Sequence, residues 1–172
     1  EEAAAFVDAE KGVESVQDAI DGAKDILAEV YADDADYRTK LRVMTKESGS
    51  LIAKAKDEEA DSVYEMYYDF SEPIKKLVGH RILAINRGEA EKFLTVKIEA
   101  PRQEILLWLV KQIIGNMKHD SASYLYEAIT DSYDRLIAPS IEREIRNELT
   151  EKAEEGAIGV FGKNLHQLLM QP

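Results

Sequence analysis

The stretch Pro139–Leu169, PSIEREIRNELTEKAEEGAIGVFGKNLHQLL, carries the longest helical pattern in the chain. Its apolar residues recur every three or four positions, which is typical of one face of an α-helix. They are Ile141, Ile145, Leu149, Ala153, Ala157, Phe161, Leu165 and Leu168 or Leu169. At 1.5 Å per residue, a single helix here would be about 45 Å long, so we expect it to project or bend. Gly156, Gly159 and Gly162 each weaken a helix by about 1 kcal/mol relative to Ala, and they predict a kink or a close helix contact.

The rest of the sequence is also mostly helical in pattern. Apolar spacing, capping residues and glycine or proline stops predict further helices. We expect them from Ser15 to about Val30, Ala35 to Ser48, Asp61 to Phe70, Pro73 to Gly79, His80 to Arg87, Arg102 to about Gly115, and from Asp120 or Ser121 onward. Alternation predicts extended chain at Ser50–Lys56 and a strand at Phe93–Ile98, closed by Pro101. The expected fold class is mainly α, a multi-helix domain over residues 1–172 with a long C-terminal helix and at most a small β element.

Several helix ends follow from local chemistry. Ser15 and Asp18 form a capping-box-like pair at the first helix, and Asp34 is placed to cap the second. Glycine ends a helix readily, so Gly49 and Gly88 predict the ends of the second helix and of the helix that begins at His80. Ser71-Glu72-Pro73 predicts a helix start, since proline in a first turn lacks only an N–H that would be unpaired anyway.

The predicted helix Asp61–Phe70 has an apolar and aromatic face. Its members are Val63, Met66, Tyr67 and Phe70. Such a face packs into a core more often than it forms a platform for stacking bases. We therefore expect core packing here.

Composition bounds the class of protein. The 172 residues include 34 Asp and Glu, 22 Lys and Arg and no Cys, and 45% are apolar, which excludes a disordered chain, a disulfide scaffold, Cys-ligated zinc and Fe–S clusters. The longest apolar stretch, Ile105–Val110, falls far short of the roughly 20 residues of a membrane span, and no signal peptide opens the chain. We expect a soluble, intracellular protein.

Because the chain begins at Glu1 rather than Met and ends at Pro172 after a helical pattern, we also expect a piece of a longer protein.

The formal charge of -12 is unevenly distributed. Residues 1–36 carry twelve acids and two bases, Lys11 and Lys24, whereas the stretch Pro73–Arg102 is locally basic, with seven bases against three acids. A strongly acidic chain does not bind polyanions as a whole. The basic stretch is therefore the plausible contact for a polyanion, although ordinary solvated charges or ion pairs with the acidic N-terminal helix explain it more simply.

No pattern for catalysis or metal binding emerges. His80, His119 and His166 are widely separated and lack zincin or di-iron spacing. The sequence contains no G-x-S-x-G, P-loop or G-x-G-x-x-G motif. Acid pairs such as Glu142 and Glu144 are typical of a solvated helix face rather than of acid–base catalysis. We expect no enzyme activity, no cofactor, no metal and no small-molecule substrate.

The segment from Tyr68 to Glu89 is less generic. It combines an acidic residue, a turn with proline, a His-Arg pair and an Arg-Gly-Glu turn; the polar members are Asp69, Glu72, His80, Arg81, Arg87 and Glu89. Arginine at a helix end can fork onto carboxylates, so one interpretation is that Arg81 and Arg87 bind Asp69, Glu72 or Glu89. The alternative is that Lys75, Lys76, Arg81 and Arg87 form a phosphate-binding edge.

These residues also resemble a known family. The runs Asp69-Phe70-Ser71-Glu72-Pro73, His80-Arg81, Leu83-Ala84-Ile85 and Arg87-Gly88-Glu89 are similar to the D-[YF]-S-E-P and S-H-R-x-L-A-I-x-R-G-E signature of the bacterial Tex (transcription accessory protein) family. Further agreement lies in Phe6-Val7-Asp8, Gly12–Val16, Ile141–Glu144, Asn164-Leu165 and Leu168-Leu169. The chain departs from the family at Gly79, where serine is usual, and at Asn86, where an apolar or basic residue is common. A side-chain contact from residue 79 would be lost.

The resemblance implies a multidomain cytoplasmic protein in which a helical region precedes a YqgF (RNase H/resolvase-like) domain, helix-hairpin-helix modules and an S1 RNA-binding domain. This chain is similar to the helical region before the YqgF domain, and no catalytic residue carries over. The implied role is a scaffold whose nucleic-acid partner, chiefly RNA, is bound by other domains, with the transcription machinery as a further partner. The alternative is direct nucleic-acid binding through residues 75–102.

Overall fold

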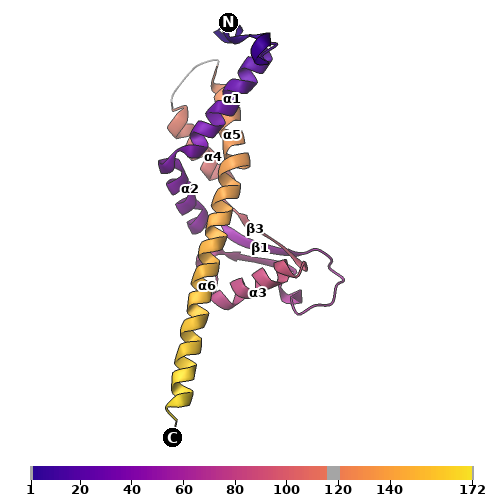
Figure 1. Ribbon diagram of the computed structural model, residues 1–172, viewed down its shortest axis with the longest axis vertical. Helices are drawn as coiled ribbons and strands as arrows, with labels where there is room; N and C mark the ends of the chain where they lie inside the picture. Colours follow the sequence, from indigo (N-terminus) through magenta and orange to yellow (C-terminus); the bar gives the residue numbers. More distant parts are fainter. Residues whose placement is uncertain (1, 116–120, 172) are drawn as a thin grey trace. The chain divides into compact units, whose positions relative to one another are not determined.

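The computed structural model describes residues 2–115 and 121–171 (Figure 1). The chain divides into two compact units. Unit 1 comprises Glu1–Leu41 and Arg102–Ile141, and unit 2 comprises Arg42–Pro101 and Glu142–Pro172. The structure is mainly helical with one small sheet, which confirms the predicted fold class.

Unit 1 is built from helices. They are α1 (Val16–Asp33), the first half of α2 (Ala35–Ser48), α4 (Arg102–Ile113), α5 (Ala122–Asp131) and the π-helical segment η5 (Ser132–Ile137), after the short 3-10 helices η1 (Glu2–Phe6) and η2 (Ala9–Lys11). The predicted caps are confirmed, because Ser15 Oγ accepts from the Asp18 N–H at 3.1 Å and Asp34 Oδ1 accepts from the Tyr37 N–H at 2.9 Å. Of the two residues predicted to cap α5, Asp120 lies outside the described residues and Ser121 makes no side-chain capping bond.

Helix α1 packs against α5 and η5. The buried side chain of Ser132 donates from Oγ to the carbonyl oxygen of Ala28 at 2.6 Å. Lys24 Nζ contacts Glu127 Oε2 at 2.7 Å, and this hydrogen bond raises the pKa of Lys24. One face of α1 is thus held against α5 and η5 by buried packing and by polar contacts.

The long C-terminal helix is α6 (Ala138–Leu169), and helical structure already begins at Ala122 through α5 and η5. The π-helical segment lies directly before Pro139. Proline has no N–H and its ring clashes with the carbonyl four residues earlier, so a wider turn at this point lets the helix continue. The predicted long helix is confirmed.

The three glycines of α6 behave differently from the prediction. Helix α6 runs through Gly156, Gly159 and Gly162 without interruption. A Cβ added at any of them would meet no described atom within 4 Å. The expected close helix contact is therefore not made by the described residues.

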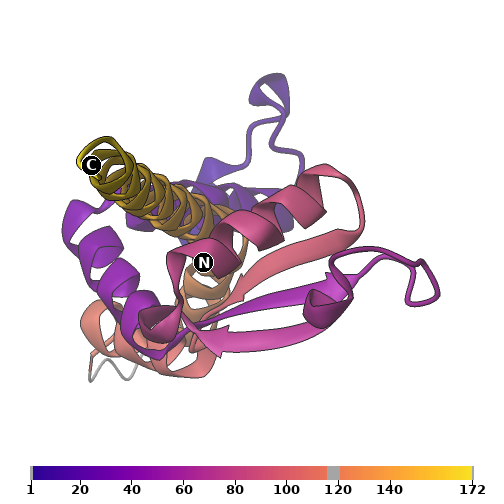
Figure 2. The same ribbon diagram turned by 90° about the horizontal axis from the view of Figure 1, so that it is seen from below.

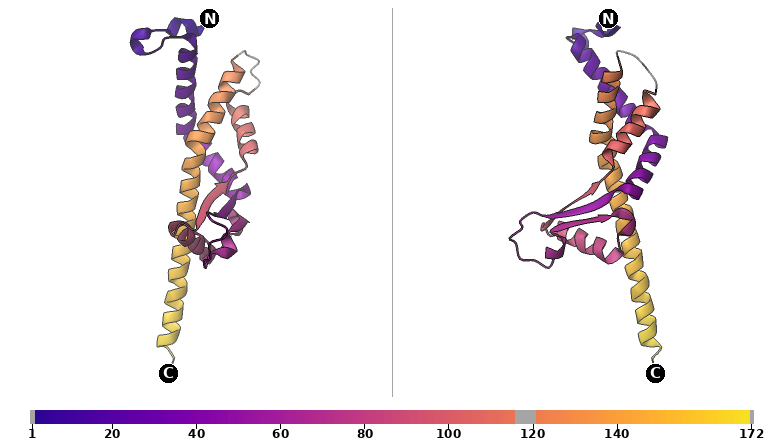
Figure 3. Two further views of the ribbon diagram at one scale, coloured as in Figure 1. Left: turned by 90° about the vertical axis from the view of Figure 1, so that its right-hand side faces the viewer. Right: turned by 180° about the vertical axis from the view of Figure 1, so that it is seen from behind.

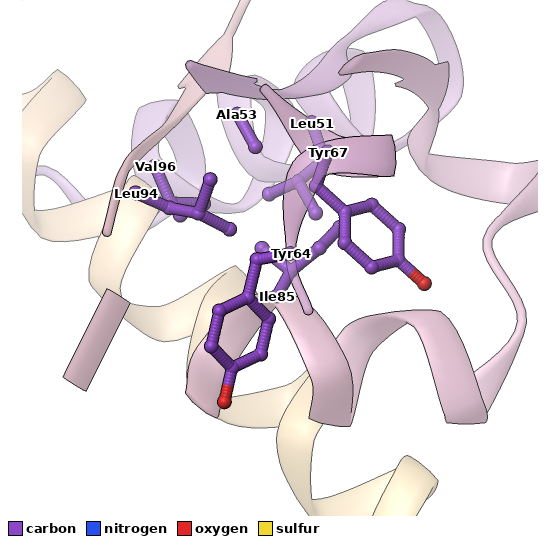
Figure 4. Packing of buried hydrophobic residues seen from close by; sticks show 7 residues of the cluster. All are labelled: Leu51, Ala53, Tyr64, Tyr67, Ile85, Leu94 and Val96. Atoms are coloured by element: carbon purple, nitrogen blue, oxygen red, sulfur yellow. The ribbon is translucent and has the colours of Figure 1, made fainter. Parts of the chain in front are cut away.

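Unit 2 contains a three-stranded antiparallel sheet in the order β2-β1-β3, formed by β1 (Ser50–Ala55), β2 (Asp69–Pro73) and β3 (Leu94–Glu99). The extended prediction for Ser50–Lys56 and the strand prediction for Phe93–Ile98 are confirmed within a residue. Helix α3 (Gly79–Ala90) lies across one face of the sheet (Figure 2). The buried cluster between them is Leu51, Ala53, Tyr64, Tyr67, Ile85, Leu94 and Val96 (Figure 4).

Two predictions between Asp61 and Pro73 are wrong in whole or in part. The segment predicted as the helix Asp61–Phe70 contains the 3-10 turn η3 (Glu65–Tyr67) and the start of strand β2. Ser71-Glu72-Pro73 ends β2, although Pro73 is also the N-cap of a short 3-10 turn. Tyr64 and Tyr67 anchor the segment in the core while Val63 and Met66 are exposed. In this segment β2 pairs with β1, and the two tyrosines are buried. These two effects outweigh the helical spacing of the apolar residues.

Glycines 79 and 88 lie inside α3 rather than outside it. The predicted short helix after Pro73 is reduced to the 3-10 turn η4 (Ile74–Lys76), and α3 starts at Gly79. The predicted helix end at Gly88 is wrong, because α3 continues to Ala90. A Cβ on Gly88 would lie 2.6 Å from Leu94 Cδ1, so glycine there permits close packing of α3 on β3.

Gly49 ends α2 as predicted, but for another reason. Its φ is not left-handed. A Cβ there would lie 2.4 Å from the carbonyl oxygen of Thr45 and 3.1 Å from that of Glu99. Backbone proximity therefore requires glycine at this position.

Tyr133 in η5 predicts a loss of stability at alkaline pH. Burial raises its pKa from 10.0 to about 12, because the folded state disfavours the phenolate. A raised pKa contributes stability that is complete below pH 10 and is lost as the pH rises through 12, by about 2–3 kcal/mol. Urea unfolding of Tyr133→Phe between pH 9 and 12 should show a flatter profile than the unmodified chain. The exposed control Tyr126→Phe should not change the profile, and equal profiles for all three proteins would contradict the expectation.

The described residues contain neither a membrane-spanning helix nor a metal-binding cluster. In residues 2–115 and 121–171, no helix has the length and apolar composition needed to cross a membrane. Across the same ranges, no group of three or more His, Asp or Glu side chains is placed to hold a metal ion.

Candidate nucleic-acid interface

The segment from β2 to α3 carries the residues singled out in the sequence. Arg81, in the first turn of α3, donates from Nη1 to Glu72 Oε2 on β2 at 2.8 Å. This is one of the pairs named by the ion-pair interpretation. Glu72 is the less exposed partner, with 19% of its side chain accessible against 43% for Arg81. The pair links the sheet to the start of the helix.

Glu89 near the end of α3 is held by a residue that the sequence did not point to. Arg146 of α6 binds both carboxylate oxygens of Glu89, at 3.0 and 2.5 Å, and also donates to Asn86 Oδ1 at 3.1 Å. Asn86 in turn donates from Nδ2 to Thr150 Oγ1 at 2.8 Å. A small polar network therefore fixes α3 to α6 within unit 2.

The network explains one departure from the family pattern. Asn86 supplies both an acceptor for Arg146 and a donor for Thr150, which an apolar residue could not do. At Gly79, a Cβ would lie 3.2 Å from the Cα of Ala153, so a serine there would press on α6.

Further contacts bind the first part of α6 to its neighbours in unit 2. Glu144 accepts from Arg42 at 2.6 Å, and Glu148 accepts from Lys46 at 2.7 Å. The hydrogen bonds from Lys46 and Lys152 lower the pKa of Glu148. Glu142 Oε1 accepts from the N–H of Ile98 at 2.9 Å, which satisfies a donor on the free edge of β3.

The predicted phosphate-binding cations are only partly brought together. Lys75 and Lys76 lie exposed on η4, immediately before α3, and Arg81 follows in its first turn. Arg87 is exposed near the other end of α3. Six residues correspond to about 240° around a helix, so Arg87 and Arg81 lie on different faces. In the part of the chain that the structure describes, Lys75, Lys76 and Arg87 form no ion pair.

The start of α3 still has a feature that suits an anion. Its N-cap, Val78, provides no side-chain hydrogen bond. The free N–H groups of a helix N-terminus attract anions, and Lys75 and Lys76 precede it directly. His80, also in this turn, is exposed.

The other residues singled out in the sequence are dispersed. Asp69 is exposed on β2 opposite Lys54 of β1. Lys97 is exposed on β3. Arg102 belongs to unit 1, where it binds Asp134 at 2.8 and 2.7 Å. His119, one of the three histidines considered, lies outside the described residues.

Comparison with known proteins decides the family. The family model described as Tex central region-like matches residues 1–161. The chain belongs to the Tex family. Its Tex relatives include the transcriptional accessory protein Tex of Neisseria gonorrhoeae, to which it is 29% identical over 177 residues, covering 98% of this chain and 23% of that protein.

Two other relatives of this Tex-family chain are closer in identity. Protein YdcI of Bacillus subtilis is 48% identical over 170 residues, covering 97% of this chain and 24% of that protein. The human S1 RNA-binding domain-containing protein 1 is 34% identical over 174 residues, covering 93% of this chain and 18% of that protein. The chain thus spans about a quarter or less of the length of these relatives.

Proposed function

We propose that residues 1–172 are a non-catalytic helical scaffold within a longer Tex-family transcription accessory protein. The observation that carries this proposal is the second half of α6. Every residue from Glu154 to Gln171 is exposed. The stretch includes five large apolar side chains that are 44–76% exposed: Ile158, Phe161, Leu165, Leu168 and Leu169.

These five side chains form one surface. At 100° per residue they fall within an arc of about 100°, the width of the stripe that a helix normally buries against a core. No residue of the described ranges covers them. The first part of α6 is fixed to α2, α3 and β3, as described above, so the helix is anchored at one end and offers an apolar stripe at the other. This suits an element that holds neighbouring domains.

The partners of the proposed scaffold follow from the relatives. One relative is named for an S1 RNA-binding domain and another as a transcriptional accessory protein. We infer that nucleic acid, chiefly RNA, is bound by domains outside residues 1–172. The net charge of -12 supports this division, since it disfavours phosphate binding by the chain as a whole. The proposal includes no cofactor and no small-molecule substrate.

A titration tests the scaffold role. The 172-residue chain is titrated with fluorescent single- and double-stranded RNA and DNA at ~150 mM salt, where phosphate contacts are already screened. We expect no binding in the sub-micromolar range. Sub-micromolar affinity would contradict a role limited to scaffolding.

The second candidate function is direct nucleic-acid contact through Lys75, Lys76, Arg81 and Arg87. It is favoured by the two lysines before the uncapped N-terminus of α3. Changing all four residues to Ala should then weaken binding at low salt and flatten its salt dependence.

The matched control for this variant removes the same charge elsewhere, from four exposed lysines without an ion pair among the described residues. They are Lys40, Lys54, Lys111 and Lys163. Equal loss of binding in the four-residue variant and in the lysine control would contradict direct contact. Direct contact would also be contradicted if the four-residue variant lost stability but bound nucleic acid normally, which is the result expected if Arg81 acts only through its ion pair with Glu72.

A further inference from the structure

Helix α1 has two apolar faces, and only one of them meets α5 and η5; the 3-10 helix η1 is a further neighbour of α1. Ala28 and Ala32 are buried on the face that meets α5 and η5. The other face carries apolar residues at successive spacings of three, four, three and four: Val16, Ala19, Ala23, Ile26 and Val30. The three large ones are 45%, 65% and 57% exposed, respectively. Figure 3 shows α1 lying beside α5 with its opposite side open.

One edge of this outer face is acidic. At 100° per residue, Asp33, Glu29 and Asp25 lie about 20°, 60° and 100° beyond Ile26 on the same side of the exposed stripe. Asp25, the most distant of the three, also lines a pocket with Lys24 and Arg135. None of these three carboxylates forms an ion pair within residues 2–115 and 121–171. The only bases of residues 1–36 are already engaged, Lys11 with Asp8 and Lys24 with Asp21 and Glu127. Arg135 of η5 also lies near Asp25 and Glu29, and their negative charges help to raise its pKa. Because Arg135 is already ion-paired with Asp131, this edge keeps a net negative charge beside the apolar stripe.

We propose that the outer face of α1 docks an amphipathic protein helix whose apolar stripe is flanked by Lys or Arg. Alternating spacings of three and four are those of a helix that packs along another helix. The small side chains of Ala19 and Ala23 let a partner helix approach closely. Basic residues on the partner would face Asp25, Glu29 and Asp33, which fixes its orientation and raises its association rate.

The same charges disfavour other occupants. A second copy of α1 would bring two acidic edges together, with a net charge of -10 in each first segment of 36 residues. Phosphate groups of nucleic acid or of anionic lipids would be repelled in the same way. A basic helix gains both apolar burial and charge complementarity.

The test uses two synthetic 21-residue helical probes. Both have Leu and Ile at the heptad positions a and d, and they carry Lys in one peptide and Glu in the other at positions e and g. Each is fluorescently labelled and titrated with the 172-residue chain at ~150 mM salt. We expect the Lys probe to bind at least about tenfold more tightly than the Glu probe, with amide NMR shifts concentrated in α1.

Apolar variants localise the site. The double variant Ile26→Ser, Val30→Ser should weaken binding of the Lys probe at least about tenfold. Both side chains are exposed, so its thermal unfolding should match that of the unmodified chain. The matched control is Leu107→Ser on α4 of the same unit, where the side chain is 72% exposed, and it should bind normally.

Charge variants test complementarity. Neutralising Asp25, Glu29 and Asp33 to the corresponding amides should weaken binding and flatten its salt dependence. The control removes the same charge from the exposed residues Asp57, Glu58 and Glu59 of unit 2. Equal effects of both triple variants would overturn the proposal, as would NMR shifts outside α1. A concentration-dependent dimer that Ile26→Ser abolishes would also overturn it, since the occupant would then be a second copy.

Discussion

Arg146→Ala should lower the free energy of unfolding of the chain by about 1.5–3 kcal/mol. The substitution removes three hydrogen bonds from the α3–α6 contact, two to Glu89 and one to Asn86. It also leaves the Glu89 carboxylate without its cation. The Arg146 side chain is only 22% exposed, whereas that of Glu89 is 36% exposed, so water recovers part of the loss and the effect stays below that of a fully buried pair. Chemical denaturation followed by far-UV circular dichroism measures it.

The control for this prediction lies on the same helix. Arg143 is exposed and forms no ion pair in the described part of the chain, so Arg143→Ala should change stability by less than about 0.5 kcal/mol. A double-mutant cycle with Glu89→Ala should give a coupling of about 1–2 kcal/mol. Equal effects of the two arginine substitutions, or no coupling, would show that the network does not hold α3 to α6.

Gly49→Ala should destabilise the chain by about 2–4 kcal/mol. The new Cβ would meet the carbonyl oxygens of Thr45 and Glu99, at 2.4 and 3.1 Å, and both belong to the backbone. Gly49 cannot move away easily, because its N–H donates to Thr45 O at 2.8 Å and its carbonyl accepts from the Ile74 N–H at 3.0 Å. Urea unfolding measures the loss.

A second glycine provides the matched control. Gly156 lies in the exposed part of α6, where an added Cβ meets no described atom within 4 Å. Gly156→Ala should therefore raise stability by up to about 1 kcal/mol, through helix propensity alone. Similar losses for both substitutions would contradict the close approach inferred at Gly49.

The helices that the sequence predicts well are those with local signals. Ser15 and Asp34 cap α1 and α2 through bonds to residues three positions away, so the information lies within a single turn. Between Asp61 and Pro73 the outcome depends on distant residues instead. Tyr64 and Tyr67 reach the core, and β2 pairs with β1, which no local spacing reveals.

In the candidate site, too, contacts between residues close in the sequence could be predicted and contacts between distant residues could not. Glu72 and Arg81 are nine residues apart and could be paired from the sequence, whereas Arg146 and Glu89 are 57 residues apart. Helix α6 has two arginines, and only the packing of α3 on α6 selects Arg146 over Arg143. The one signal in the sequence was Asn86, whose departure from the family pattern marks a side chain with polar partners.

Hydrogen exchange of residues 154–169 tests the proposed scaffold role most directly. A helix segment of this length that contains three glycines and lacks packing contacts is marginal alone, so its amides should exchange rapidly in the 172-residue chain. In the longer Tex-family protein, neighbouring domains on the apolar stripe should slow exchange at least about tenfold, and Ile158→Ser with Leu165→Ser should remove that protection. Equally rapid exchange in both proteins would contradict the proposal that this part of α6 holds neighbouring domains.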